Sequence, residues 1–178
     1  NLTVPSGPTV SEGDKMALVG FIVGDPRAND GGESVNCRLT GVAPNDFHVP
    51  ISESPQSDFG DPSNYQKSGA TTAEKEAAKK AVHDAEVTGV VVELIPQNRP
   101  EARKWTRQGL KQLRDRNARV LIVGQLMFDD EHVPNPNDVC CQPRRVSVWE
   151  LHPVTDIRVC PSTGSCSVAN SDEWPGEQ

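Results

Sequence analysis

Residues 87–128, VTGVVVELIPQNRPEARKWTRQGLKQLRDRNARVLIVGQLMF, decide the fold of this chain. The first part, 87–95, is rich in β-branched residues and stops at Pro96, which predicts a central strand. Apolar residues then recur at helical spacing from Pro100 to Asn117, so we expect a helix with one apolar side. Residues 119–128 are again typical of a strand. The segment is therefore a strand, a capping helix and a second strand.

The flanking sequence adds three more strands. Residues 14–24 form an apolar run that ends in a turn at Asp25-Pro26. A second strand is expected over 35–39 and 47–51, and a last one over 144–159, after a loop. Three strands, a helix and two strands is the order of an OB-fold, so we predict a mainly β protein with an OB-type barrel. A small mixed α+β sheet is the alternative that uses the same elements.

We expect one domain over residues 1–178, because the length suits a single core. Strands one and two occupy 14–51, and strands three to five with their helix occupy 87–159. Residues 52–86 form a polar insertion whose helix starts at Thr71-Thr72-Ala73-Glu74, a capping-box spacing. Residues 160–178 are polar and are expected to form an extended tail.

The composition excludes several classes of partner. Lys and Arg number 18 against 25 Asp and Glu, and the net charge of −7 disfavours general binding to nucleic acids or anionic membranes. No apolar run approaches the roughly 20 residues of a membrane span. The chain starts at Asn1 like a processed end, so we expect an extracellular or periplasmic protein whose signal peptide has been removed. A protein or carbohydrate partner fits this composition.

Five cysteines favour an oxidising compartment. Cys160 and Cys166 bracket a flexible segment, so we predict a disulfide between them. Cys37 could then pair with Cys140 or with Cys141, which leaves one thiol. A structural zinc site is the rival interpretation, although the chain has no Cys-x2-Cys knuckle.

Acids and histidines gather at the ends of the predicted strands. Strand ends of a barrel can converge, so these side chains could form one polar site. Glu150 and His152 are two residues apart on one strand and are expected to point to the same face. The other members of the set are His48 in Asp46-Phe47-His48, Glu93, Asp129 and His132.

Three roles are open for this set. His48, Glu93, Asp129 and His132 could hold a divalent metal ion that activates water, and Zn²⁺, Mn²⁺ or Fe²⁺ would suit these ligands. Glu150 could instead orient His152 as a catalytic general base. In the structural alternative, Glu150 and His152 face the barrel interior with Val154 as a buried polar pair.

Basic residues offer a further candidate binding surface. Lys104, Arg107, Lys111 and Arg114 fall on one side of the predicted helix. This stripe could bind phosphates, whereas a solvated helix face is its ordinary explanation. Arg144 and Arg145 lie at the start of the last strand and could complete the polar site.

Two runs carry a resemblance to known proteins. RVSVWELHPV (145–154) and VGQLMFDDEH (123–132) resemble a group of mostly uncharacterised bacterial exported proteins that end in a Glu-x-His-Pro-Val strand. The resemblance implies a matching core and a shared polar cluster, and it brings no activity with it. The order of strands and helix also resembles the thermonuclease branch of OB-folds, whose arginine and carboxylate pattern these residues do not reproduce.

We therefore expect an exported OB-type protein with a His and carboxylate site. The enzyme hypothesis is a divalent-metal-dependent hydrolase acting on phosphodiesters. The alternative hypothesis is a non-catalytic binding or assembly module in which the His and Glu cluster is a structural network.

Overall fold

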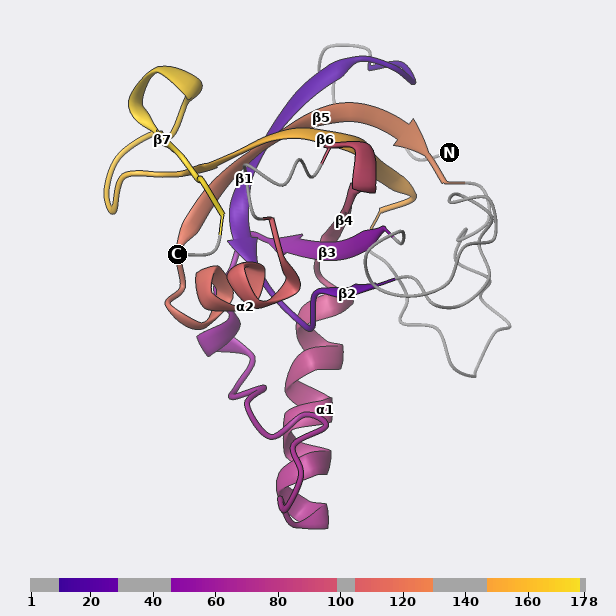
Figure 1. Ribbon diagram of the computed structural model, residues 1–178, viewed down its shortest axis with the longest axis vertical. Coiled ribbons are helices and arrows are strands. Elements are labelled where there is room, and N and C mark those ends of the chain that lie inside the picture. Colours follow the sequence, from indigo (N-terminus) through magenta and orange to yellow (C-terminus); the bar gives the residue numbers. More distant parts are fainter. Residues whose placement is uncertain (1–9, 29–45, 99–104, 130–146, 177–178) are drawn as a thin grey trace, which may run out of the picture.

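A computed structural model describes residues 10–28, 46–98, 105–129 and 147–176 (Figure 1). Figure 1 shows a strongly curved sheet, with α1 and the segment before it extending away from the barrel. None of the described helices is long and apolar enough to cross a membrane. The strands are β1 (Lys15–Ile22), β2 (Arg27–Ala28), β3 (Phe47–Ser52), β4 (Val90–Leu94), β5 (Arg119–Phe128), β6 (Trp149–Val159) and β7 (Asp172–Glu173). The helices are α1 (Thr72–Glu86) and α2 (Arg107–Asp115), with short 3₁₀ turns η2 (Gln56–Asp58), η3 (Pro96–Asn98) and η5 (Val168–Asn170).

Five of these strands close into a barrel. Their order is β1, β5, β6, β4 and β3, and a β1–β3 pairing closes the circle. β4 and β6 run parallel, and the other neighbours are antiparallel. This is the strand order of an OB-fold, with α2 between the third and fourth barrel strands. The predicted mainly β, OB-type fold is therefore confirmed.

Closure between β1 and β3 depends on Gly20. An added Cβ at this position would lie 2.6 Å from the carbonyl oxygen of Ser52 and 2.8 Å from Cγ2 of Ile51. A Cβ atom does not fit at those distances, so only glycine lets the two strands approach. Gly20 of the first predicted strand thus marks the place where the barrel closes.

The barrel interior is filled by alternate residues of the strands and capped by α2. Val49 of β3, Val92 of β4 and Ile122 of β5 are fully buried in one core cluster. Leu110 and Leu113 of α2 join that cluster, together with Trp105 just before the helix. Thr106 caps α2 by accepting a hydrogen bond from the backbone of Gly109, so the observed helix begins at Arg107.

β6 does not keep the strict alternation that the sequence predicts. Its pairing with β5 shifts twice, between Val123 and Gly124 and between Gly124 and Leu126. Extra residues on β6 at these bulges change which side chains face inward. The core residues are Leu151, Val154 and Ile157, spaced by three. The prediction that Val154 shares a face with Glu150 and His152 is therefore wrong, because the bulge at His152-Pro153 turns Val154 into the core beside Leu151.

The polar insertion contains the predicted helix. Thr71 accepts from the backbone of Glu74, and the Glu74 carboxylate accepts from the backbone of Thr71, so the capping box is formed. Ala78, Ala81, Val82 and Ala85 are buried, while most of the other helical positions, among them His83, are exposed.

The end of the chain differs from the extended tail that was predicted. Cys160 and Cys166 form the predicted disulfide, with their Cα atoms 5.4 Å apart. The chain then returns along β6 as β7 and places Trp174 in the barrel core. Burial of this large aromatic side chain anchors an otherwise polar segment to the barrel. Three predictions lie outside the described residues: the strand over 35–39, the start of the last strand over 144–146, and the pairing of Cys37 with Cys140 or Cys141.

Candidate functional site

Three side chains form a row across the outer wall of the barrel. His48 of β3 is the register partner of Glu93 on β4. Val92 pairs with Leu151 in the parallel β4–β6 contact, so Glu93 and His152 are the next neighbours along these strands. Because successive residues of a strand point to opposite faces, this row points away from the core that Val92 and Leu151 fill. We call His48, Glu93 and His152 the His–Glu row.

The Glu93 carboxylate bridges the two imidazoles. Nε2 of His48 lies 2.8 Å from Oε1 of Glu93, and Nδ1 of His152 contacts the other carboxylate oxygen, Oε2. The side chains of His48, Glu93 and His152 are 13%, 7% and 16% exposed. One largely buried carboxylate thus fixes the orientation of two rings that still reach solvent.

Both ends of the Glu93–His152 contact are shifted toward their charged forms. Burial raises the pKa of Glu93, but hydrogen bonds from His152 and His48 outweigh it and hold the pKa far below its ordinary 4.5. The hydrogen bond to Glu93 raises the pKa of His152 above 6.5. Burial opposes this shift, and the negative charges of Glu93 and the fully buried Asp46 support it. The geometry therefore favours an ion pair.

We expect the stabilisation from this ion pair to be largest between pH 4.5 and pH 6.5. The lowered pKa of Glu93 gives stability that is present above pH 4.5 and is lost as the pH falls through that lowered value. The raised pKa of His152 gives stability that is complete below pH 6.5 and is lost as the pH rises through the raised value. Urea unfolding of wild type and Glu93→Gln, inside and outside this pH interval, measures the stabilisation. Inside the interval, the free energies of unfolding of the two proteins should differ by about 1.5–3 kcal/mol.

The control for this prediction is Glu76→Gln, the same substitution at an exposed position of α1. It should change the free energy of unfolding by no more than about 0.5 kcal/mol at any pH. A wild-type to Glu93→Gln difference that stays constant with pH would show that the contact does not titrate as described.

The structure brings together part of the predicted set. The acid in contact with His152 is Glu93, whereas the sequence spacing had suggested Glu150. Glu150 and Asp129 are both buried, and the backbone N–H of Asp129 donates to the carbonyl of Val148. The described ranges contain no group of three or more His, Cys, Asp or Glu side chains placed to hold a metal ion. His132, the remaining member of the predicted metal set, lies outside these ranges.

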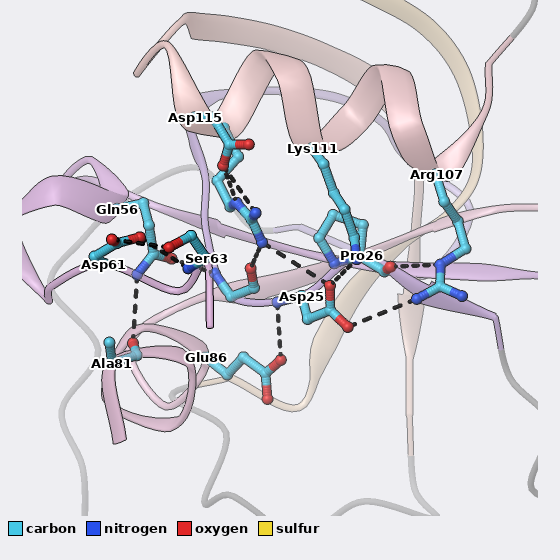
Figure 2. A network of polar contacts seen from close by, with 12 residues as sticks. Asp25, Pro26, Gln56, Asp61, Ser63, Ala81, Glu86, Arg107, Lys111 and Asp115 are labelled. Carbon is cyan, nitrogen blue, oxygen red and sulfur yellow. Dashed lines mark hydrogen bonds and ion pairs between the residues drawn. The ribbon is translucent and has the colours of Figure 1, made fainter. Parts of the chain in front are cut away.

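The basic stripe of α2 does not form the solvated face that was expected. Arg107 donates through Nε to the carbonyl of Pro26, and its Nη2 lies 3.6 Å from the carboxylate of Asp25. Lys111 lies 2.6 Å from the same carboxylate (Figure 2). Arg114 reaches Asp25 at 3.9 Å and donates to the carbonyl of Gly24. These four charged residues, the Asp25 network, tie α2 to the end of β1.

Sequence reasoning missed Asp25 because it stands in a turn next to Pro26. The basic residues of α2 could have pointed to this acid. Three cations spaced four and three residues apart lie on one face of a helix, and they need an anion when that face packs against the protein. Arg107, which was predicted to bind a ligand, contacts Pro26 and Asp25 in this network. Lys104, Arg144 and Arg145, the other predicted binding residues, lie outside the described ranges.

No protein-family model, curated protein or solved structure matches this chain.

Proposed function

We propose that the His–Glu row is the active site of a hydrolase that acts on phosphodiester-type substrates. The observation that carries the proposal is the contact of one buried carboxylate with Nδ1 of His152. A carboxylate on one ring nitrogen fixes the tautomer and orientation of an imidazole, and the opposite nitrogen is then available for proton transfer. His152 is the proton acceptor in this scheme, and Glu93 is the positioning residue.

The location of the row supports the proposal. β3 and β4 are the second and third strands of the barrel, and OB-folds bind oligonucleotides and oligosaccharides on the face of those strands. This part of the argument is an analogy at the level of the fold.

The chemistry is a general-base hydrolysis. Nε2 of His152 takes a proton from water while the water oxygen forms a bond to phosphorus, and the ester oxygen leaves and is protonated by solvent. Protonated His152, paired with Glu93, then releases its proton. The raised pKa of His152 makes it a stronger base than an isolated imidazole.

The test is hydrolysis of bis(para-nitrophenyl) phosphate, with para-nitrophenyl acetate as a carboxylic ester for comparison. His152→Asn keeps an amide N–H near the position of Nδ1 but lacks Nε2, so activity should fall about 100-fold while the fold is kept. Glu93→Gln should lower activity and also return the pKa of His152 toward 6.5, as measured by NMR titration. Glu76→Gln, which changes an exposed acid of α1, should leave both unchanged.

Wild-type protein that cleaves neither ester, or cleavage that survives His152→Asn, contradicts the hydrolase. Treatment with EDTA is a separate part of the test. If EDTA abolishes activity and added Mn²⁺ or Zn²⁺ restores it, water is activated by a divalent metal ion.

A non-catalytic binding or assembly module is the second candidate. Glu93 is nearly inaccessible and joins three adjacent strands through its two imidazole contacts, as a structural network would. Under this alternative Glu93→Gln lowers stability in the pH interval given above, and no ester is cleaved.

The Cys160–Cys166 disulfide supports the proposal that the protein functions outside the cytoplasm, in the extracellular space or the periplasm.

A further inference from the structure

A second site is formed by the insertion and the end of α2, apart from the His–Glu row. A cleft of about 490 Å³ lies between residues 56–63 and residues 114–117. Small-molecule sites commonly have volumes of about 300–1,000 Å³, so this cleft has the size of a ligand site. No residue of the His–Glu row lines it.

The floor of the cleft is fixed by buried polar contacts. Gln56 is 3% exposed and accepts from the backbone of Gly24 at 2.7 Å. Its amide nitrogen lies 3.2 Å from the carbonyl of Gly60, to which it donates. Gly60 has a φ of +114°, a backbone conformation that favours glycine, and an added Cβ would lie 3.2 Å from Ala81. These contacts hold the floor of the cleft in place from within the protein.

The charges on the walls exclude an anionic ligand. Asp61 and Asp115 both line the cleft, and Arg114 is the one cation among the described residues that line it. Nε and Nη2 of Arg114 each lie 2.8 Å from Oδ1 of Asp115, and Nη1 donates to the carbonyl of Gly24. Because these donors are engaged within the protein, the guanidinium has little left to offer a phosphate or a carboxylate.

The remaining groups suit a ligand with many hydroxyls. Asp61 is held by the backbone N–H and hydroxyl of Ser63, at 2.8 and 2.9 Å, and its oxygens have further lone pairs. Ser57 contributes a hydroxyl, and Asn117 contributes an amide whose oxygen accepts from the Ser57 backbone. Pro62 adds an apolar surface against which ring C–H groups can pack.

We propose that this cleft binds a neutral polyhydroxylated ligand of the carbohydrate class. Adjacent sugar hydroxyls donate to the carboxylates of Asp61 and Asp115 and accept from Ser57 and Asn117. The site is independent of hydrolysis at the His–Glu row, so it stands or falls separately from the proposed function.

The test is a titration of backbone amide NMR signals of the full chain with glucose, galactose, mannose and N-acetylglucosamine. At least one sugar should give saturable shifts confined to residues 56–63 and 114–117. Asp61→Asn and Ser57→Ala should each weaken that binding about tenfold or more, as expected for a lost hydrogen bond that involves a charged or fixed partner. Asp172→Asn on β7, an exposed acid outside the cleft, is the matched control and should leave the affinity unchanged.

Urea unfolding of each variant separates a lost contact from a lost fold. Shifts that map to the His–Glu row, or no shift with any of the four sugars, would overturn the proposal. A response to ethylenediamine without a response to the sugars would overturn it as well, because it would identify a site for organic cations.

Discussion

Replacing Asp25 with Asn is expected to destabilise the protein by about 3 kcal/mol or more, the range for removing one partner of a buried ion pair. The Asp25 side chain is 8% exposed and has Lys111, Arg107 and Arg114 within 4 Å. Asn keeps the shape but leaves three cations around a neutral group. Lys111 and Arg107 are partly exposed and can turn to solvent, whereas Arg114 is 7% exposed, cannot do so without opening the structure, and keeps its contact with the exposed carboxylate of Asp115.

Urea unfolding of Asp25→Asn and of Asp84→Asn gives the measurement and its control. Asp84 pairs with Lys80 on the exposed surface of α1, and such a pair contributes only about 0.3–0.5 kcal/mol. Lys111→Met in the Asp25→Asn background should recover part of the loss, because it removes one of the unpaired charges. An Asp25→Asn effect no larger than that of Asp84→Asn would mean that the Asp25 network contributes little.

Replacing Trp174 with Ala should destabilise the protein by about 3–5 kcal/mol, the usual cost of removing a buried Trp side chain. Trp174 is 6% exposed and belongs to the same core cluster as Trp105 and Ile157. Its backbone N–H donates to Ile157, and its carbonyl accepts from Nε1 of Trp105 at 3.3 Å. Loss of the indole leaves a cavity beneath α2 and frees the end of the chain.

Circular dichroism during urea unfolding reports this loss without relying on tryptophan fluorescence. Val168→Ala is the control within the same segment, because Val168 is 51% exposed and its truncation should change stability by less than about 0.5 kcal/mol. Similar shifts for the two variants would show that the end of the chain does not belong to the cooperative core.

The two predictions concern features that local sequence patterns do not reveal. Trp174 stands in a polar segment, and its burial depends on β7 pairing with β6. Asp25 stands in a turn, and its partners come from a helix more than eighty residues later in the chain. A pattern read over a few residues contains no information about a contact of that range.

The candidate site shows the same division. The sequence marked His48 and His152 through their acid-histidine segments and Glu93 by itself, because polar residues stand out in otherwise apolar strands. The pairing of His152 with Glu93 followed only from the parallel contact of β4 with β6. The interpretation based on Glu150 looked for the partner of His152 within β6, whereas the acid in contact with His152 comes from the adjacent strand β4.

The sequence by itself determined the order of strands and helices, the capping of α1 and the Cys160–Cys166 disulfide, because periodicity, capping residues and close cysteine spacing act within short stretches of chain. Only the tertiary structure decided which acid orients His152, which anion binds the cations of α2 and where Trp174 lies. Those contacts join strands and helices distant in sequence, and their geometry is set by barrel closure, strand register and bulges rather than by local preference.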